Sequence, residues 1–457
     1  MIDYQFIILQ NPWWKSVGLI KNDPKIKEFE KSLYKFFPKE VVDFKYKPGA
    51  VNILYGPRQT GKSTAVKLLI KKLLEQNFNP ENILYFSCDA LLDKKDVIDL
   101  VLNFLSSIKG TNYIFLDEIS AVPDWPYAIK WLVDGGMLSK SNILLTGSSS
   151  INLKRSGEFM PGRRFGGKDI KYLPVGFYDY VELVSGLKNV GLAKNFKELI
   201  SLEKSFEKKS ISLKELHSRF ILSGGFLKVM HLIGRKESLT DTTDLYKNTV
   251  LSELAKFGKK ELFAKKVLEK IITGLTSETS YAAVAEEAEL GSKNTAADYL
   301  MFFEDSFFVK QALFYDIAQK KIRLKKNKKY YPTDPFLFWV FNALVYGASD
   351  IYPYYEKYSQ PPLAGQVCES FIASELYKKN FDFYFFKNSR ELDFYIPKFE
   401  LGIEVKYKDK ISSEDLRSLD FSRNKILVSK NTLEMRGDVW VVPYYLFPFI
   451  DLSSLAV

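Results

Sequence analysis

The sequence predicts an α/β protein of several domains, in which an N-terminal arm precedes a parallel-sheet core, a helical lid, a winged helix and a C-terminal α/β domain. The chain has 457 residues, which is too many for one ordinary hydrophobic core. A glycine-rich stretch lies between an apolar run and a helical pattern near the start, and short apolar runs carrying acids follow near the end. The predicted boundaries are residues 1–47 for the arm, 48–180 for the core, 181–275 for the lid, 276–350 for the winged helix and 363–457 for the C-terminal domain.

The composition narrows the class of protein. A hydrophobic content of 46% and an aromatic content of 15% indicate a folded, globular chain. Two cysteines offer no disulfide framework, so we expect a reducing, cytoplasmic compartment. The apolar runs stop short of the roughly 18 residues that a membrane span needs. The N-terminus lacks a basic start and a small-residue cleavage site, so we expect neither a membrane helix nor a signal peptide.

The net charge of the chain indicates which kinds of molecule it could bind. A formal net charge of +11 favours polyanions such as nucleic acid. A generally lysine-rich proteome would give the same balance, so the charge alone leaves both interpretations open.

The stretch GPRQTGKST carries the strongest chemical signal. The run AVNILY before it predicts a buried strand, and AVKLLIKKLLEQN after it has apolar residues at helical spacing. A strand, a glycine-rich turn and a helix in this order form a phosphate-binding loop whose amides face an anion. We expect Lys62 to reach the β- and γ-phosphates of ATP and Ser63 to place its hydroxyl on Mg²⁺. The predicted nucleotide-binding residues are Gly56, Pro57, Arg58, Gln59, Thr60, Gly61, Lys62, Ser63 and Thr64.

The run YIFLDEIS, residues 113–120, predicts a buried strand that ends in two acids. We expect Asp117 to hold Mg²⁺ and Glu118 to polarise an attacking water as a general base. A solvated strand end is the alternative interpretation. Another strand-like run, NILYFSC, separates the phosphate loop from Asp117. This order is typical of P-loop ATPases with a catalytic glutamate rather than of nucleotide kinases or G proteins.

Five motifs together resemble those of the archaeal AAA-type ATPases: NPWW, GPRQTGKST, FLDEI, LLTGSSS and PGRRF. In that family a restriction-endonuclease-like domain often follows at the C-terminus. The resemblance implies that Thr146 or Ser148 senses the γ-phosphate. It also implies an arginine finger at Arg163 or Arg164, which usually reaches a neighbour's nucleotide and would then require a homo-oligomer. A surface or backbone contact is the alternative for each arginine. The NPWW motif, residues 11–14, would line the adenine pocket or form a packed arm.

The middle of the chain, residues 181–275, has apolar and charged positions at helical spacing, which predicts the lid. A break at Gly224 and Gly225 would separate two of its helices. Arg219 would be a second nucleotide sensor or, alternatively, a surface arginine.

Residues 281–316 predict a winged helix, with one helix, a turn at Gly291, a second helix and a β-rich run. The second helix begins with SKNT, residues 292–295, where polar side chains would meet DNA bases or phosphates. The stretch KKIRLKKNKK, residues 320–329, has seven basic residues in ten and suits phosphate contacts. The alternatives are a winged helix that packs only against its neighbours and a solvated run of charge.

A second set of chemical residues follows a Pro- and Tyr-rich stretch, residues 351–362, that indicates a linker. Glu369 lies in a predicted helix and Asp393 in a predicted strand. Glu404 and Lys406 lie two residues apart in the next strand, where positions i and i+2 share a face. Carboxylates bind divalent cations through hard oxygens, and the lysine would position or deprotonate a metal-activated water.

The helix–strand–strand order of these four residues resembles the PD-(D/E)XK nuclease superfamily. The resemblance implies a metal site formed by the three acids, with the lysine as a catalytic residue. The chain departs from the pattern at Leu392, which stands where the superfamily has a proline, and Glu391 would be a further ligand. A nuclease-like fold that has lost activity or only binds DNA is the alternative.

These expectations lead to three functional hypotheses. The first is an ATP-driven enzyme that acts on DNA and carries a metal-dependent nuclease-like domain. The second is an ATP-dependent DNA- or protein-binding switch whose nuclease-like domain is inactive. The third is a remodelling or defence-type regulator whose partner is another protein. The first hypothesis is favoured by the basic stretch, residues 320–329, and by the presence of suitable residues at all four positions of the predicted metal site.

Overall fold

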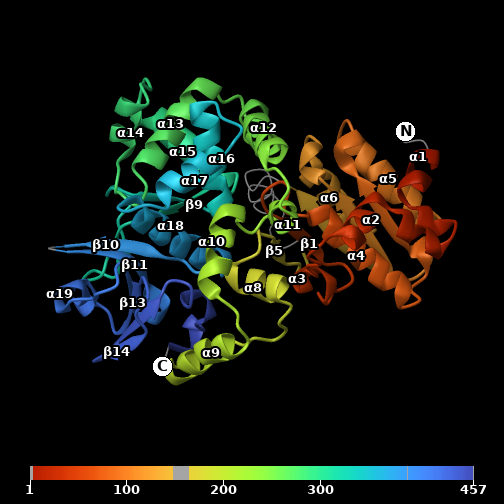
Figure 1. The fold of residues 1–457 in the computed structure, drawn as a ribbon. Coiled ribbons are helices and arrows are strands. Elements are labelled where there is room, and N and C mark those ends of the chain that lie inside the picture. Colours follow the sequence, from red (N-terminus) through yellow and green to blue (C-terminus); the bar gives the residue numbers. More distant parts are fainter. Residues whose placement is uncertain (1–3, 148–163, 389, 456–457) are drawn as a thin grey trace. The chain divides into compact units, whose positions relative to one another are not determined.

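The computed structural model describes residues 4–147, 164–388 and 390–455. The chain divides into two compact units, Met1–Leu173 and Pro174–Val457. Figure 1 shows the elements of each unit.

The first unit is built on a parallel sheet with the strand order β2-β3-β4-β1-β5. Each strand lies in an apolar run that the sequence identifies, so the predicted parallel-sheet core is confirmed. Strand β4 lies between β1 and β3 and pairs with both. The strands are β1 (Val51–Tyr55), β2 (Ile83–Ser87), β3 (Asn112–Asp117), β4 (Ser141–Gly147) and β5 (Asp169–Lys171).

Helices cover both faces of this sheet. Along a strand, successive side chains point to opposite faces. Ile53 therefore packs into the core beside α5 and α6, whereas the next residue, Leu54, packs against α4. The helices of the first unit are α1 (Tyr4–Gln10), α2 (Pro24–Lys31), α3 (Lys39–Val42), α4 (Lys62–Glu75), α5 (Lys94–Ser106) and α6 (Trp125–Asp134), with 3-10 turns η1 (Pro12–Trp14), η2 (Val17–Asn22), η3 (Pro80–Asn82), η4 (Cys88–Ala90) and η5 (Ile119–Ala121).

The NPWW motif covers the open edge of the sheet at β2. The Asn11 Nδ2 donates to the Tyr85 carbonyl at 2.8 Å, and the Tyr85 amide donates back to Asn11 Oδ1 at 2.7 Å. The indole nitrogens of Trp13 and Trp14 both donate to the Ile83 carbonyl, at 3.1 and 2.8 Å. These side chains satisfy backbone groups that an edge strand would otherwise expose. The geometry therefore matches the packed-arm interpretation of the motif and not the adenine-pocket one.

The second unit begins with helices and continues into two short hairpins. In the first hairpin β6 pairs antiparallel with β9, and in the second β7 pairs with β8. The helices α14 and α15 lie on either side of Gly291, as the sequence predicts. The elements of this part are α8 (Phe177–Ser185), α9 (Phe196–Lys208), α10 (Leu213–Ser223), α11 (Leu227–Arg235), α12 (Thr240–Lys256), α13 (Glu261–Thr273), α14 (Tyr281–Glu287), α15 (Lys293–Asp305), β6 (Val309–Ala312), β7 (Tyr315–Asp316), β8 (Lys321–Ile322), β9 (Lys329–Pro332) and α16 (Pro335–Tyr346).

The last part of the second unit is an α/β domain with a mixed sheet of order β10-β11-β12-β13-β15-β14. The strands β12, β13 and β15 run parallel, and the remaining pairs are antiparallel. Its elements are α17 (Tyr352–Tyr358), α18 (Leu363–Lys378), β10 (Tyr384–Lys387), β11 (Glu391–Ile396), β12 (Leu401–Lys406), α19 (Ser413–Leu416), β13 (Asn424–Ser429), β14 (Glu434–Arg436) and β15 (Val439–Pro443), with 3-10 turns η6 (Pro397–Phe399), η7 (Arg417–Phe421), η8 (Phe447–Phe449) and η9 (Leu452–Leu455).

The structure corrects the predicted linker at residues 351–362. Helix α17 occupies most of this stretch, and Pro353 stands in its first turn, where a missing amide hydrogen costs nothing. Tyr358 is buried and packs edge-on against Phe338 and Trp339 of α16. Tyr358 is therefore part of the core, whereas Tyr352 of the same stretch is exposed.

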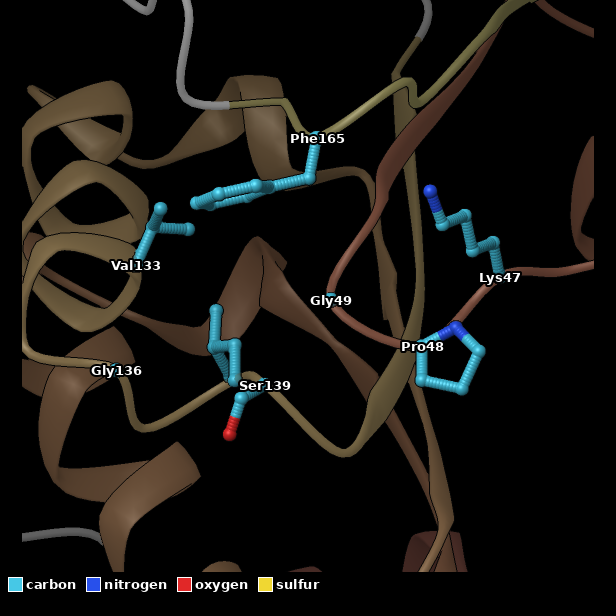
Figure 2. A pocket seen from close by; sticks show the side chains of 8 residues that line it. Lys47, Pro48, Gly49, Val133, Gly136, Ser139 and Phe165 are labelled. Atoms are coloured by element: carbon cyan, nitrogen blue, oxygen red, sulfur yellow. The ribbon is translucent and has the colours of Figure 1, made fainter.

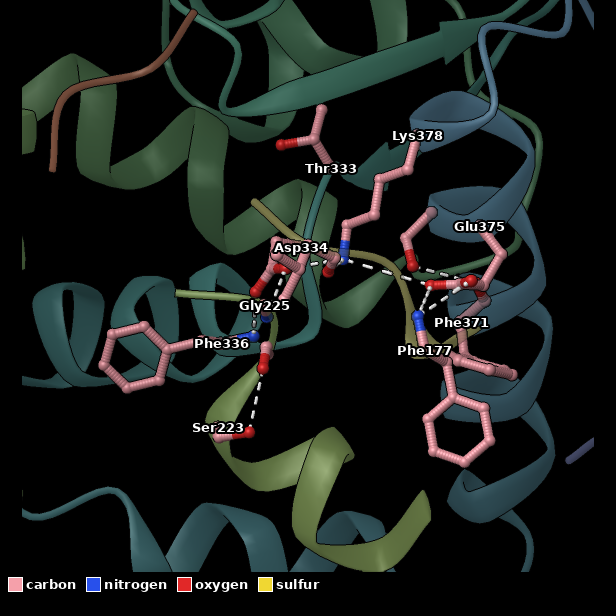
Figure 3. Close-up of polar contacts among 12 residues, drawn as sticks. Phe177, Ser223, Gly225, Thr333, Asp334, Phe336, Phe371, Glu375 and Lys378 are labelled. Atoms are coloured by element: carbon pink, nitrogen blue, oxygen red, sulfur yellow. Dashed lines mark hydrogen bonds and ion pairs between the residues drawn. The ribbon is translucent and has the colours of Figure 1, made fainter. Parts of the chain in front are cut away.

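A buried ionic cluster joins four segments of the second unit (Figure 3). The fully buried Asp334 accepts the amides of Gly225 and Phe336, both at 2.9 Å, and the ammonium of Lys378 at 2.7 Å. One turn earlier on α18, Glu375 accepts the amide of Phe177 at 3.1 Å. Through this cluster, helix α18 contacts three other segments: the start of α8, the turn between α10 and α11, and the start of α16.

The predicted break between two lid helices is required by this cluster. A Cβ on Gly224 would stand 1.7 Å from Asp334 Oδ1, and one on Gly225 would stand 1.9 Å from the Val175 carbonyl. Both positions therefore need glycine for close approach of the backbone.

Within the described ranges, every helix is too short or too polar to span a lipid bilayer.

Candidate functional site

The phosphate loop follows β1 and opens α4. The loop passes so close to the Tyr172 carbonyl that a Cβ on Gly56 would stand 1.9 Å from its oxygen. Gly61 adopts a φ of +96°, in the left-handed region that favours glycine, and Gln59 also has a positive φ of 64°. Thr60 closes the loop by donating its hydroxyl to the Pro57 carbonyl at 2.9 Å.

Helix α4 begins at Lys62, so the first amides of the helix point out of the loop. The Lys62 ammonium folds back over the loop and donates to the carbonyls of Gly56 at 3.0 Å and Pro57 at 2.8 Å. Ser63 and Thr64 follow in the first turn and are half-buried. Amides, a helix N-terminus and an ammonium group at one place suit a polyphosphate.

The Asp117 carboxylate at the end of β3 is held on both of its oxygens. The Tyr85 hydroxyl donates to Oδ2 at 2.8 Å, and the Thr146 hydroxyl of β4 donates to Oδ1. Thr146 Oγ1 also accepts the Glu118 amide at 3.0 Å. Glu118 adopts a φ of 51° and is half-buried, whereas Asp117 is buried. Asp117 is therefore shielded from solvent, whereas Glu118 is partly accessible to it. Thr146 contacts both residues and so fixes their relative positions.

The phosphate loop and the two acids lie at the same edge of the sheet. The strands β1, β4 and β3 are parallel neighbours, so their carboxyl ends meet at one edge. Gly56 follows β1, Asp117 ends β3, and Thr146 is the next-to-last residue of β4. The arrangement fits a nucleotide with Mg²⁺, for which Ser63 and Asp117 would supply oxygen ligands.

The structure places Arg164 away from this edge. Its Nε donates to the carbonyl of Val51 at 3.2 Å, and its guanidinium pairs with Asp169 at 2.9 Å. Val51 begins β1 and Tyr55 ends it, a separation of about 13 Å at 3.3 Å per residue. Arg164 therefore does not meet the phosphate loop of its own chain. Ser148 and Arg163 lie outside the described residues.

Sequence reasoning missed a buried lysine beside the candidate nucleotide site. The Lys67 ammonium on α4 lies 3.3 Å from the centre of the Tyr85 ring and 5.0 Å from that of Trp13. It pairs with Asp23 at 3.1 Å. Burial lowers the pKa of Lys67, and the Asp23 charge acts in the opposite direction. Lys67 thus supports the tyrosine that holds Asp117, and the NPWW motif packs against the same lysine.

The four carboxyl-terminal candidates gather at one end of the mixed sheet. Asp393 on β11 accepts the Val405 amide of β12 at 2.9 Å through Oδ2. Glu404 and Lys406, on one face of β12, pair with each other. Burial, together with the Asp393 charge, raises the pKa of Glu369 to about 7 and that of Glu404 to about 8.

A fifth residue, Lys329 of β9, lies among these acids. Its ammonium contacts Glu391 at 2.5 Å, Glu369 at 3.1 Å and Asp393 at 3.5 Å, and its side chain is 1% exposed. Although burial disfavours its charged form, Tyr331 and the surrounding carboxylates raise the pKa of Lys329 well above its ordinary value. The sequence placed Lys329 in a solvated or phosphate-binding run. Its period-2 spacing with Tyr331, in a strand-like stretch, was the one signal of a buried face.

This arrangement does not fit a divalent cation, because an ammonium group already occupies the space between the carboxylates. Among the residues that the structure describes, no group of three or more His, Cys, Asp or Glu side chains is disposed to hold a metal ion.

A cavity of about 370 Å³ lies at the other edge of the first unit's sheet (Figure 2). Lys47 to Gly49 precede β1, and Leu138 and Ser139 precede β4, so the cavity is at the amino ends of these strands. In Figure 2 the Phe165 ring extends toward Val133 across the cavity. Lys47 is the one charged residue among the described residues that line it, so this lining lacks the acidic side chains of the candidate nucleotide site.

Comparisons with known proteins match two parts of the chain. The family model of an AAA domain matches residues 49–181. A family model described as a domain of unknown function (DUF4143) matches residues 364–447.

Two relatives are similar over more than half of this chain. An uncharacterized protein of Methanocaldococcus jannaschii is 26% identical over 282 residues, which cover 59% of this chain and 57% of the relative. An uncharacterized protein of Haemophilus influenzae is 26% identical over 304 residues, which cover 62% of this chain and 67% of the relative. The matched region thus spans little more than half of the archaeal relative's length.

Two solved structures from archaea are also similar. A Walker-type ATPase of Pyrococcus abyssi has a TM-score of 0.42 at 13% identity, covering 70% of this chain and 93% of its own. The ORC1 protein of Aeropyrum pernix, solved in complex with DNA, has a TM-score of 0.32 at 13% identity, covering 73% and 96%. The matched AAA model, together with the phosphate loop and the Asp117 strand, shows that the first unit carries an AAA-type P-loop ATPase domain.

Proposed function

We propose that this chain binds ATP with Mg²⁺, hydrolyses it and acts on DNA. The observation that carries the proposal is the meeting of the phosphate loop, Lys62, Asp117 and Glu118 at one edge of the parallel sheet. The matched AAA domain covers all of these residues.

Each residue of this site has a role in the proposed reaction. Lys62 would leave the loop carbonyls that it contacts and turn to the β- and γ-phosphates. Ser63 and Asp117 would hold Mg²⁺, which neutralises phosphate charge when it is bound. Glu118 would accept the proton of the attacking water. Thr146 keeps both acids in place, because its hydroxyl contacts the Asp117 carboxylate and the Glu118 amide.

The proposal of DNA as a partner rests on the α14–α15 region and the hairpins after it. Three helices, α13 to α15, precede the antiparallel β6–β9 pair, which is the element order of a winged helix. The N-terminus of α15 exposes residues 292–294. Beyond β6, the lysines at positions 320, 321, 325 and 326 are exposed, and Arg323 pairs with Asp316. Exposed cations of this density suit phosphate contacts.

For the C-terminal domain we propose a nuclease-like fold. Helix α18 carries Glu369, the antiparallel pair β11–β12 carries Asp393 and Glu404, and Lys406 ends β12. This order agrees with the resemblance that the sequence indicates.

Two kinds of macromolecular partner follow from the same proposal. An arginine finger at Arg163 or Arg164 would act in a homo-oligomer, on the nucleotide of a neighbouring chain, since Arg164 lies far from its own phosphate loop. A protein partner in place of DNA is the competing outcome of the binding test below.

The test is the binding of a fluorescent DNA duplex, followed by anisotropy over a range of salt concentrations, with and without ATP. The variant changes Lys320, Lys321, Lys325 and Lys326 to Gln. The matched control changes four exposed lysines of α9 and its end to Gln, namely Lys197, Lys204, Lys208 and Lys209. Each lost phosphate contact lowers the slope of log affinity against log salt by about 0.9.

We expect a slope reduced by roughly 2 to 4 in the first variant and an unchanged slope in the control. Equal slopes in wild type and both variants would remove these lysines from the DNA contact. Absence of any binding at low salt, where electrostatic binding is strongest, would favour the protein partner.

A further inference from the structure

The side chain of Lys329 enters the carboxylate cluster of the C-terminal domain from a different part of the chain. Lys329 begins β9, whereas its three acidic contacts come from α18 and β11. The strand alternates, so Lys329 and Tyr331 share a face. The Tyr331 hydroxyl donates to Glu369 Oε1 at 2.6 Å, on the same oxygen that the ammonium contacts. Strand β9 thus presents one cation and one hydroxyl to the acids.

These contacts place a positive charge among the oxygens that a metal ion would use. Glu369 Oε1 has two donors, Asp393 Oδ1 faces the ammonium, and Asp393 Oδ2 accepts a backbone amide. Glu404 Oε1 pairs with Lys406, and Glu404 Oε2 is buried without a hydrogen-bond partner among the described residues. The Lys329 ammonium therefore lies between the Glu369 and Asp393 carboxylates, where a divalent cation shared by these two acids would have to bind.

We infer that the Lys329 ammonium takes the place of the divalent cation, so that the C-terminal carboxylates form a metal-independent ion-pair network. The inference rests on the proposed nuclease-like arrangement of this domain and goes beyond it, because it assigns the domain a binding role without metal-dependent cleavage. The ammonium is covalently part of β9, so its exchange for a metal would require the Lys329 side chain to leave the three carboxylates that it contacts.

The same network has a second consequence for the exposed lysines at positions 320 to 326. These residues lie between β6 and β9, and β9 is fixed to the C-terminal domain through Lys329 and Tyr331. The bridge between Phe314 and Phe385 adds a second attachment, to β10. The carboxylate network therefore anchors the basic segment that we propose contacts DNA.

The test is Mn²⁺ binding to the full chain without nucleotide, measured by the loss of the free-ion electron paramagnetic resonance signal. Mn²⁺ is the probe because it accepts the oxygen ligands that Mg²⁺ accepts and is visible to this method. Wild type is compared with Asp393→Asn, Lys329→Met and the double variant Lys329→Met/Asp393→Asn. Lys406→Met is the matched control, because it removes the other lysine of the cluster and leaves Lys329 in place.

We expect wild type, Asp393→Asn and Lys406→Met to bind the same number of Mn²⁺ ions. We expect Lys329→Met to bind one more, and the double variant to lose it. An ion bound by wild type and lost in Asp393→Asn would overturn the inference. An Mn²⁺ ion that wild type binds only in the presence of duplex DNA, and that Asp393→Asn does not bind, would also overturn the inference. Lys329 would then give way to a metal ion when DNA is bound.

If Lys329→Met fails to fold, the comparison of wild type with Asp393→Asn still shows whether the carboxylates of the C-terminal domain bind a metal ion. The readout depends on Asp393 alone and needs no nucleotide. A failure of ATP hydrolysis or of DNA binding, which would refute the proposed function, is therefore distinguishable from a failure of this inference.

Discussion

The stability of the C-terminal network gives the sharpest prediction. Replacing Lys329 with Met removes a cation whose side chain is 1% exposed and leaves three carboxylates without it. Two of them, Glu369 and Asp393, have side chains only 12% and 10% exposed. Removing one partner from a buried ionic group costs about 3–5 kcal/mol, because the remaining charges stay out of water.

This loss of free energy corresponds to a lower melting temperature of the second unit. The second unit spans Pro174–Val457, or about 280 residues. At roughly 2.1 cal/mol/K per residue its unfolding entropy near 60 °C is about 0.6 kcal/mol/K, so Tm should fall by about 5–8 °C. Differential scanning calorimetry at pH 7 measures this shift in the transition of the C-terminal unit.

The adjacent residue provides the control. Lys328 is also buried, but among the described residues its ammonium donates to the carbonyls of Leu324 and Lys326, at 2.9 and 3.0 Å, and lies 4.3 Å from the centre of the Tyr281 ring, with no carboxylate contact. Both carbonyls belong to exposed residues, so water replaces the lost donor and Lys328→Met should cost about 1 kcal/mol. A Tm loss in Lys329→Met no larger than that in Lys328→Met would refute the account of the network.

Three further predictions concern other parts of the chain. Burial lowers the pKa of His217 to about 3, below its value of about 6.5 in an unfolded chain, so its share of stability is complete above pH 6.5 and falls as the pH drops. Urea unfolding should therefore show a loss of about 2 kcal/mol from pH 7 to pH 5 that His217→Phe removes. Gly56→Ala places a Cβ 1.9 Å from the Tyr172 carbonyl and should weaken ATP binding more than tenfold in calorimetric titration. Tyr85→Phe removes the hydroxyl that donates to Asp117 and should lower kcat for ATP about tenfold, since hydrogen bonds to charged groups contribute about 1.5–3 kcal/mol.

Each of these predictions has a control variant or a result that would contradict it. An unchanged pH dependence in His217→Phe would mean that other groups titrate in this window. Gly365→Ala, whose Cβ would meet its nearest atom at an ordinary 3.7 Å, should leave ATP affinity unchanged. Tyr113→Phe, on the neighbouring strand, should leave kcat unchanged. Equal kcat values for Tyr85→Phe and wild type would show that Asp117 needs no support from Tyr85.

The elements of the candidate nucleotide site can be predicted from the sequence because that site is nearly local. Gly56 to Thr64 lie in one turn, and the strand that ends in Asp117 is a plain apolar run. Parallel strands bring such ends to one edge whatever the details of packing. The family resemblance names Thr146 as one of two candidate γ-phosphate sensors, whereas its contact with the Asp117 carboxylate follows from the strand order and not from any spacing.

The parts that sequence reasoning missed all depend on contacts between distant segments. Lys329 belongs to a run of positive charge, and a charge run is usually solvated, yet β9 turns this lysine toward acids that lie 40 or more residues away. Lys67 sits at a helix position that looks amphipathic, and its partners Asp23 and Tyr85 come from separate elements. The Pro- and Tyr-rich stretch before α18 has the composition of a linker, and the burial of its Tyr358 depends on Phe338 and Trp339 of α16.

The hydrolysis of ATP tests the central claim most directly. Turnover should be measured with and without duplex DNA in wild type, in Glu118→Gln and in the exposed control Glu81→Gln. We expect wild type and Glu81→Gln to hydrolyse ATP at equal rates. We also expect duplex DNA to change the rate of both proteins. We expect Glu118→Gln to bind ATP normally and turn it over at least 100-fold more slowly, the lower end of the range of roughly 10²–10⁴ for general bases. Equal turnover in Glu118→Gln and wild type, or no turnover in wild type under any condition, would contradict the account.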